Sequence, residues 1–270
     1  MPSYAVIGAS RGIGLEIVRQ LATDSANTIF AVVRDKANSP YIATVASFPN
    51  VHILQADVVD HAALKVAAVE AASITGGTLD VLIHSAAYMD VTFMSRGLTD
   101  YESDEQLDAE LTKAFQINAL GAVHSINAFL PLLRKGTVKK IMVLSSEAGN
   151  RDMTWQMRFS GMAAYGLSKA ALDMVMTKYA AQLERDGFTV FALSPGPTDT
   201  GSTSNLVVNE LNTPEMQELM KRWEDSVANL DTSMMPVDQT VKRVLILLAK
   251  LGPADSASFR LSEEVRAIQV

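Results

Sequence analysis

The stretch from residue 3 to residue 22 reads SYAVIGASRGIGLEIVRQLA and decides the fold of this chain. Its first part, Ser3 to Ile7, is a short apolar run of the kind that forms a buried strand. Glycines at positions 8, 12 and 14 follow, and from Leu15 onward the apolar residues recur at helical spacing. A strand, a glycine-rich turn and a helix in this order predict the beginning of a βαβ unit.

The three glycines suit a turn that binds a dinucleotide. Gly8 allows the positive φ of a tight turn, Gly12 lets the backbone approach a pyrophosphate, and Gly14 lets the helix pack close to the strand. The helix amino terminus then offers unpaired N–H groups to an anion. A tight connection without a ligand would also use three glycines, so the other elements must decide. The predicted cofactor contacts in this turn also include Ser10, Arg11 and Ile13.

A second strand is predicted from Asn27 to Val33, and the residue that follows it indicates the cofactor. Arg34 stands where an acidic residue would bind a free ribose 2′-hydroxyl, and a guanidinium suits a 2′-phosphate. Arg11 offers a second cation to the same phosphate. We therefore expect NADP(H), with NAD(H) as the alternative because Asp35 adjoins Arg34. A solvated strand end is the other interpretation of Arg34.

Four more strands are predicted, and helical patterns long enough for crossovers separate them. Such crossovers imply parallel strands. No repeat, low-complexity tract or linker divides the chain. The sequence therefore predicts an α/β protein with one Rossmann domain over residues 1–270, a doubly wound parallel sheet with helices on both faces. The four strands are 51–56, 79–83, 139–144 and 188–193.

Composition excludes several classes of function. The chain has 270 residues, of which 48% are hydrophobic, and 23 Lys and Arg against 30 Asp and Glu give a net charge of -7. This balance argues against nucleic-acid binding. There is no cysteine and the four histidines are scattered, so no metal site is expected. The late apolar run 244–249 is far shorter than the roughly 20 residues of a spanning helix, so we expect no membrane contact. The first strand leaves no room for a leader, so we expect a cytoplasmic protein.

Two segments are predicted to lie around the core. The acidic residues between Asp100 and Glu110 predict a solvated loop and a first helical turn without chemistry. Residues 200–236 are irregular and rich in methionine, with Met216 and Trp223 among them, and predict a substrate lid. Packing of an amphipathic helix is the alternative for the second segment.

Tyr165 and Lys169 lie on one face of a predicted helix, four residues apart. An ammonium group near a phenol favours the phenolate, so this pair predicts an acid-base catalyst with a lowered tyrosine pKa. The fifth strand ends in Ser145 and Ser146, at the sheet edge where ligands bind in open α/β folds. We take Ser146 as the hydroxyl that holds a substrate carbonyl. The turn from Pro195 to Thr200 follows the sixth strand at the same edge.

These residues together resemble the short-chain dehydrogenase/reductase family over nearly the whole chain. The resemblance implies that Tyr165 is the general acid, that Lys169 modulates its pKa and binds ribose, and that Ser146 orients the carbonyl. It also implies that Asn118 holds a proton-relay water and that Asp57 with Val58 contacts adenine. The remaining implied cofactor contacts are Ser85, Ala86 and Ala87 at the end of the fourth strand, and Pro195, Gly196, Thr198 and Thr200 at the nicotinamide.

Two departures from the family pattern stand out. The family's Asn-Asn-Ala-Gly is His84-Ser85-Ala86-Ala87 here, so only backbone contacts are expected to survive. Tyr165 follows Ser146 by 19 positions, a longer interval than is usual, and the extra residues include Trp155, Met157 and Phe159. This predicts an apolar insertion beside the substrate site, with Trp155 and Trp223 as substrate contacts, and is similar to the sniffer/C-factor-like carbonyl reductases.

The resemblance implies an NADP(H)-dependent reductase that converts a ketone or aldehyde to an alcohol. An NAD(H)-linked alcohol dehydrogenase and a non-catalytic cofactor-sensing protein of the same fold are the alternatives. The intact Ser146, Tyr165, Lys169 and Asn118 disfavour the second. Pairing through the helices that contain Asn118 and Tyr165 is common in the family, so a homodimer or homotetramer is implied.

Overall fold

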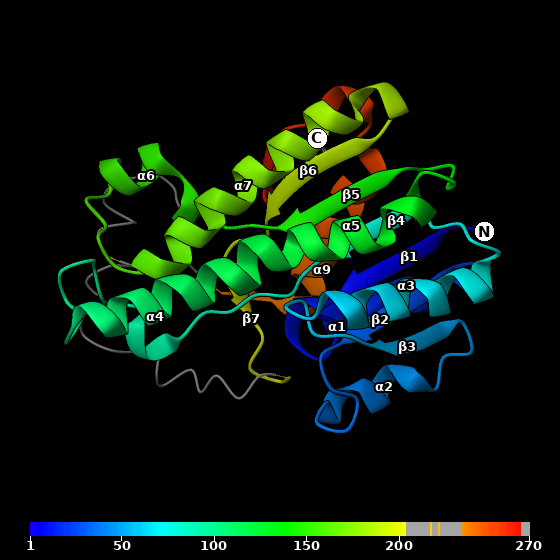
Figure 1. Cartoon of the computed structure of the whole chain (residues 1–270), viewed down its shortest axis with the longest axis horizontal. Helices are drawn as coiled ribbons and strands as arrows, with labels where there is room; N and C mark the ends of the chain where they lie inside the picture. The colour runs from blue at the N-terminus through cyan, green and yellow to red at the C-terminus, as the bar shows by residue number, and fades with distance from the viewer. Residues whose placement is uncertain (204–216, 218–220, 222–233, 266–270) are drawn as a thin grey trace.

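The computed structural model describes residues 1–203, 217, 221 and 234–265. Its centre is a seven-stranded sheet in the order β3-β2-β1-β4-β5-β6-β9, in which each neighbouring pair is parallel (Figure 1). A second, two-stranded sheet pairs β7 with β8. The strands are β1 (Ser3–Ile7), β2 (Thr28–Val33), β3 (Val51–Gln55), β4 (Val81–His84), β5 (Lys140–Leu144), β6 (Thr189–Ser194), β7 (Thr198–Asp199), β8 (Met235–Pro236) and β9 (Phe259–Leu261).

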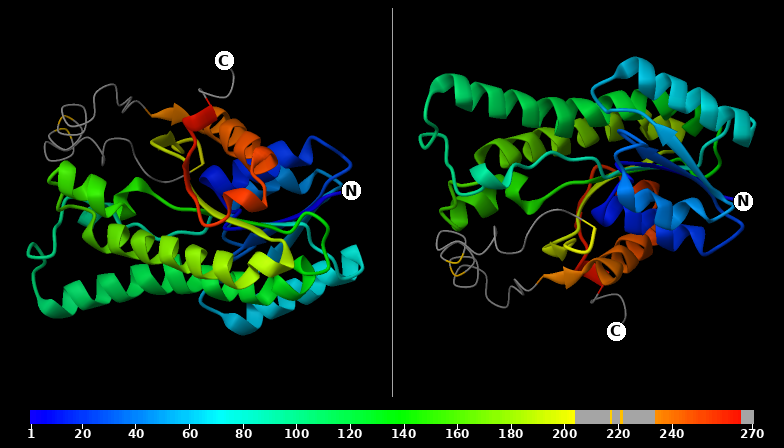
Figure 2. Two further views of the ribbon diagram at one scale, coloured as in Figure 1. Left: turned by 90° about the horizontal axis from the view of Figure 1, so that it is seen from above. Right: turned by 90° about the horizontal axis from the view of Figure 1, so that it is seen from below.

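Helices cover both faces of the large sheet (Figure 2). Side chains alternate along each strand. Phe30 and Val32 of β2 therefore lie in one core cluster, with α3, α5 and α7, whereas Ile29 and Ala31 lie in the other, with α1, α2 and α9. The helices are α1 (Gly12–Ala22), α2 (Ala43–Ala46), α3 (His61–Thr75), α4 (Asp104–Phe115), α5 (Gly121–Leu133), α6 (Arg151–Gln156), α7 (Ala163–Leu183) and α9 (Val237–Lys250).

The predicted fold class is confirmed, and the six predicted strands form within one or two residues of the expected positions. The sequence missed β9 and the two-residue strands β7 and β8. All three are too short to show a period, and β9 is only partly buried, so no apolar run marks it. No helix in the described part of the chain is long and apolar enough to span a membrane.

Strand order positions the site. β1 has β2 on one side and β4 on the other, so the chain changes direction across the sheet at β1, and ligands of open α/β sheets bind at the carboxyl ends of the strands there. The glycine turn follows β1, His84 ends β4, and Ser145 and Ser146 follow β5 at this edge. The central part of the predicted lid, with Met216 and Trp223, lies outside the described residues.

Candidate active site

The glycine turn has the conformation that its sequence predicts. Gly8 has a φ of +87°, and a Cβ there would lie 2.5 Å from the backbone nitrogen of Ala86. A Cβ on Gly14 would overlap the carbonyl oxygen of Gly8. The N–H groups of Ile13 and Gly14, in the first turn of α1, donate to no group of the described residues. The turn therefore presents free donors at a helix amino terminus.

Residues after β6 close over this turn. The N–H of Gly12 donates to the hydroxyl of Thr203 at 2.9 Å, and a Cβ on Gly12 would lie 3.4 Å from Cγ2 of Thr200. The predicted contact residue Thr200 therefore lies beside the glycine turn. Thr203 was missed by sequence reasoning, because only the fold shows that its hydroxyl reaches a glycine 191 positions earlier. The Thr198 hydroxyl is already bonded to the carbonyl of Gly196 at 3.0 Å.

Other predicted cofactor residues lie around the same edge. Arg34 is exposed immediately after β2, and Arg11 is exposed in the glycine turn. Neither side chain has a hydrogen bond to another described residue that would compete for a ligand. Val58 is buried against Gly121, where a Cβ would lie 2.8 Å from it. Ser85 stays attached to β1 through a 2.8 Å bond from its N–H to the carbonyl of Ile7, and its predicted backbone contact with the cofactor stays a prediction.

Tyr165 and Ser146 come together at the end of β5. Tyr165 lies in the first turn of α7, and the Ser146 hydroxyl interacts with it so as to lower its pKa. Burial outweighs this effect and raises the pKa of Tyr165 to about 12. The sequence predicts a lowered pKa and the structure gives the opposite direction. The phenol is therefore protonated at neutral pH, which is the form that a general acid needs.

Lys169 lies one helical turn further along α7 and is buried. Its Nζ donates to the carbonyl oxygen of Leu144 at 2.7 Å and lies 5.4 Å from the centroid of the Tyr165 ring. Burial lowers the pKa of Lys169 to about 8, and the carboxylate of Asp173 acts in the opposite direction. The side chain is thus held by β5 at the level of Tyr165.

Asn118 lies in a π-helical turn, Gln116–Leu120, between α4 and α5. Its amide accepts from the N–H of Tyr88 at 2.6 Å and donates to the Tyr88 carbonyl at 2.9 Å and to the Ser168 hydroxyl at 2.8 Å. The side chain is completely buried. The Asn118 side chain thus links the segment after β4 to α7 through hydrogen bonds to Tyr88 and Ser168. π-Turns of this kind often mark functional positions in helices.

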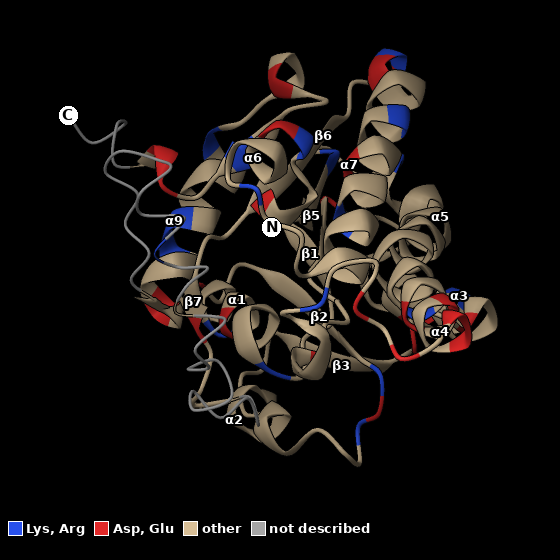
Figure 3. Cartoon of the chain, turned by 90° about the vertical axis from the view of Figure 1, so that its left-hand side faces the viewer, with Lys and Arg blue, Asp and Glu red and all other residues tan. Residues whose placement is uncertain are grey.

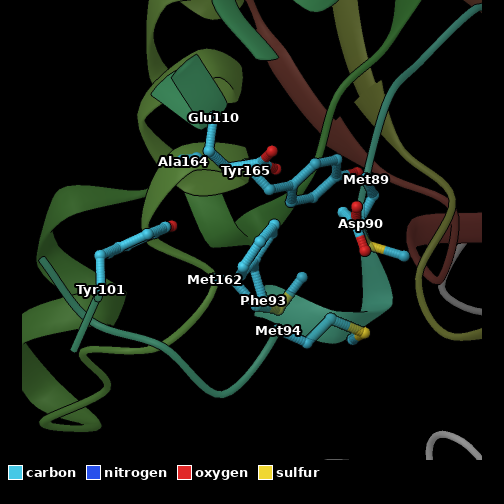
Figure 4. A pocket seen from close by; sticks show the side chains of 9 residues that line it. All are labelled: Met89, Asp90, Phe93, Met94, Tyr101, Glu110, Met162, Ala164 and Tyr165. Carbon is cyan, nitrogen blue, oxygen red and sulfur yellow. The ribbon is translucent and has the colours of Figure 1, made fainter. Parts of the chain in front are cut away.

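A small cavity of about 10 Å³ lies beside the Tyr165 ring (Figure 4). Its wall comes mainly from the segment after β4, and the insertion before α7 adds only its last residues. Glu110 was predicted to be solvated, but it is only 7% exposed and accepts a hydrogen bond from the Tyr88 hydroxyl at 2.8 Å. The prediction holds for the start of α4, where acidic residues gather in the exposed first turn (Figure 3). The lining residues are Met89, Asp90, Phe93, Met94, Tyr101, Glu110, Met162, Ala164 and Tyr165.

Comparison with known sequences identifies the family. The family model described as enoyl-(acyl carrier protein) reductase matches residues 8–233. The short-chain dehydrogenase/reductase atnB of Arthrinium sp is 35% identical over 246 residues, which are 91% of each chain. The chain belongs to the short-chain dehydrogenase/reductase family. The short chain dehydrogenase virK of Hypocrea virens is also similar, at 38% identity over 215 residues, 78% of this chain and 79% of that protein.

Two solved structures show a similar fold. The NADPH-bound carbonyl reductase from chicken fatty liver superposes with a TM-score of 0.74 over 97% of each chain at 27% identity. The carbonyl reductase Sniffer of D. melanogaster has a TM-score of 0.75 over 97% of each chain, and its 22% identity shows a common fold.

In this short-chain dehydrogenase/reductase, His84 and Asp173 are buried titratable groups that interact with Lys169. His84 is 1% exposed, and neither ring nitrogen has a hydrogen-bond partner among the described residues. Burial and the charge of Lys169 lower the pKa of His84 to about 3, so the ring is neutral. Burial raises the pKa of Asp173 to about 6. The Ser145 hydroxyl faces Asp173 and opposes that rise, although the two do not reach standard hydrogen-bond geometry.

The structure thus gathers Ser146, Tyr165 and Lys169 at one sheet edge, with Asn118 behind them. Trp155 lies on α6 with 69% of its surface exposed and the Arg158 guanidinium 3.6 Å above its ring. It does not line the cavity beside Tyr165, and neither do Met157 and Phe159. Its role as a substrate contact stays a prediction, and the role of Trp223 falls outside the described residues.

Proposed function

We propose that this protein is an NADP(H)-dependent carbonyl reductase that converts a ketone or aldehyde to an alcohol. The observation that carries the proposal is the pairing of a protonated Tyr165 with the Ser146 hydroxyl at the sheet edge, one helical turn from Lys169. Two neighbouring hydroxyl groups that can both donate suit a carbonyl oxygen, which gains charge as it is reduced.

The residues at the glycine turn fit a nicotinamide dinucleotide. The free N–H groups of Ile13 and Gly14 suit a pyrophosphate, and the side chains of Thr200 and Thr203 lie beside Gly12 at the same turn. The exposed guanidinium groups of Arg34 and Arg11 suit a 2′-phosphate, which supports NADP(H) over NAD(H). The NADPH bound in the chicken reductase agrees with this choice. When bound, the reduced cofactor supplies the hydride.

The chain's own residues handle the proton. Ser146 donates a hydrogen bond to the carbonyl oxygen and orients it, and Tyr165 gives its phenolic proton to that oxygen as the carbonyl carbon gains the hydride. The nearby ammonium of Lys169 stabilises the phenolate that remains until a proton returns. The Tyr88 carbonyl and the Ser168 hydroxyl take both hydrogens of the Asn118 amide, so a relay water held by this residue would donate to one of its oxygens.

A panel of ketones, aldehydes and quinones, each incubated with NADPH or NADH and followed by cofactor absorbance, tests this function. We expect oxidation of NADPH with at least one carbonyl class and a higher kcat/KM with NADPH than with NADH. An enoyl thioester belongs in the panel because of the family description. Higher kcat/KM with NADH favours the NAD(H)-linked dehydrogenase. Tight cofactor binding without any turnover favours the cofactor-sensing protein.

We also propose that the protein self-associates through α4 and α7. A groove on their outer side is lined by Leu111, Phe115 and Leu167 among others, and Phe115 and Leu167 are 45% and 52% exposed. Leu167→Glu should convert an oligomer to a monomer in light scattering, because a charge cannot be buried unpaired at an interface. A wild-type monomer would contradict the proposal.

A further inference from the structure

The cavity beside Tyr165 has a polar side that the reduction mechanism leaves unused. Glu110 of α4 is buried, and its Oε2 accepts a hydrogen bond from the Tyr88 hydroxyl at 2.8 Å. Its other oxygen, Oε1, accepts no hydrogen bond from the described residues. In Figure 4 the Glu110 side chain extends from its helix toward the Tyr165 ring. A strong acceptor is therefore available at the wall of the cavity.

Tyr101 supplies a matching donor. Its hydroxyl oxygen is shielded from solvent and has no hydrogen-bond partner among the described residues. In Figure 4 this hydroxyl points into the space that the other lining side chains enclose. Buried polar groups are rarely left without a partner, so an orphaned hydroxyl in a cavity indicates a ligand or a water.

The ring of Tyr101 is held firmly although its hydroxyl is free. Its centroid lies 5.6 Å from that of Phe93, and the guanidinium of Arg96 lies 5.9 Å from it. Arg96 is fixed in turn by a 3.0 Å bond to Gln106 and a 3.5 Å ion pair with Glu102. The donor is thus preorganised, which reduces the entropy lost when a ligand binds.

The electrostatics of the wall favour one class of ligand group. Asp90 also accepts from the Tyr88 hydroxyl, at 3.3 Å, so two carboxylates share one donor beside the cavity. The cations near this wall lie over aromatic rings: Lys113 Nζ is 4.1 Å from the centroid of the Tyr88 ring, and the Arg96 guanidinium is 5.0 Å from that of Phe93. The other lining side chains are mostly apolar: Met89, Phe93, Met94 and Met162. A carboxylate or phosphate would meet like charges in a partly buried site, whereas a neutral hydroxyl would not.

The cavity volume of about 10 Å³ is close to that of a single water-sized probe. It accepts one oxygen atom with its proton rather than a whole ring. A hydroxyl group fits this space and this pairing, since it accepts from Tyr101 and donates to Glu110 at the same time.

We propose that Tyr101 and Glu110 form a subsite for a hydroxyl group of the carbonyl substrate, so that the enzyme reduces uncharged, hydroxylated ketones and rejects carboxylated ones. This inference rests on the proposed function. The subsite borders the Tyr165 ring, so the hydroxyl and the reacting carbonyl belong to one compact, ring-sized substrate.

The test uses a matched set of aryl ketones: acetophenone and its hydroxy, methoxy and carboxy derivatives, in both the meta and the para series. For each, kcat/KM with NADPH is measured for wild type and Tyr101→Phe. The hydroxy-to-parent ratio is kcat/KM for a hydroxy derivative divided by kcat/KM for acetophenone with the same enzyme. Comparing this ratio between wild type and variant cancels the intrinsic reactivity of each ketone. In at least one series we expect Tyr101→Phe to lower that ratio by about 3- to 10-fold, the effect of one neutral hydrogen bond. Tyr41→Phe, on the opposite face of the sheet, is the matched control and should leave the ratio unchanged.

The second variant addresses charge. Glu110→Gln should raise kcat/KM for the carboxy derivative relative to acetophenone by about tenfold or more, whereas Glu105→Gln on the exposed first turn of the same helix should not. Thermal melting identifies a variant that fails to fold. If Glu110→Gln does not fold, the result with Tyr101→Phe decides alone, because that change removes only an unpartnered hydroxyl.

Unchanged hydroxy-to-parent ratios in Tyr101→Phe would overturn the subsite and leave the reductase function intact. Wild type that reduces neither these ketones nor any other carbonyl with NADPH would overturn the proposed function and the subsite with it.

Discussion

Replacing Asp173 by Asn should raise the unfolding free energy above that of wild type at neutral pH. This gain should shrink as the pH falls. Burial raises the pKa of Asp173 from 3.8 to about 6. A carboxyl whose pKa is higher in the folded than in the unfolded state opposes folding once it ionises. The cost is absent below the unfolded value, develops between about pH 4 and 6, and is complete above pH 6.

The magnitude follows from the shift. Each pKa unit corresponds to about 1.4 kcal/mol, so the rise of Asp173 from 3.8 to about 6 amounts to about 2–3 kcal/mol of unfolding free energy, at the lower end because the residue keeps some solvent contact. Urea unfolding of wild type and Asp173→Asn at intervals from pH 4 to 7.5 measures it. The stability gained by the variant should grow across this range. A difference that stays constant with pH would refute the reasoning.

Activity gives a second readout on the same variant. Asp173 raises the pKa of Lys169, which burial lowers to about 8. Without the carboxylate this pKa should fall further, so the alkaline limb of the kcat/KM profile should move to lower pH. Asp152→Asn on α6, where the side chain is 77% exposed, is the control and should change neither profile. An alkaline limb that does not move in Asp173→Asn would show that Asp173 does not act on Lys169.

Further variants test individual residues. Tyr165→Phe should lower kcat by ~10²–10⁴ while NADPH affinity in a fluorescence titration stays nearly unchanged, and more than about a tenth of wild-type turnover would remove Tyr165 as the acid. Arg34→Ala should weaken NADPH by roughly 10- to 150-fold more than NADH, as charged hydrogen bonds to a 2′-phosphate require, and equal weakening of both would contradict this. Trp155→Ala should lower kcat/KM for a bulky aromatic ketone more than for a small aldehyde without lowering Tm, since the ring is 69% exposed; equal losses would remove Trp155 from the substrate site.

The parts of the fold that the sequence predicts are those with strong local signals. β1, β2 and β6 are mainly apolar runs of five or six residues, and the glycines at positions 8, 12 and 14 favour a tight turn into α1. The spacing of Tyr165 and Lys169 is likewise local, because it depends on a single helix. β9, with three partly buried residues, has no such signal.

The residues that the sequence misplaces depend on contacts distant in the chain. Glu110 belongs to an acidic run that predicts a solvated face, and only its bond to Tyr88, 22 positions earlier, explains its burial. In the apolar insertion, Trp155 is 69% exposed and the Arg158 guanidinium lies over its ring, so its predicted contact with substrate stays a prediction. Hydrophobicity indicates that a residue favours packing, but not which neighbours it packs against. The prediction of a lowered Tyr165 pKa was wrong for a related reason, because the burial that raises this pKa is a property of the fold.

Transfer of label from cofactor to product tests the central claim most directly. The purified protein is incubated with a carbonyl compound from the panel and NADPH that carries deuterium in the transferred position, and the alcohol is examined by NMR and mass spectrometry. Hydride transfer with Tyr165 as proton donor predicts deuterium on the carbon that was the carbonyl carbon and a solvent-exchangeable proton on its oxygen. An alcohol without deuterium, or NADPH consumed without any alcohol, would contradict it.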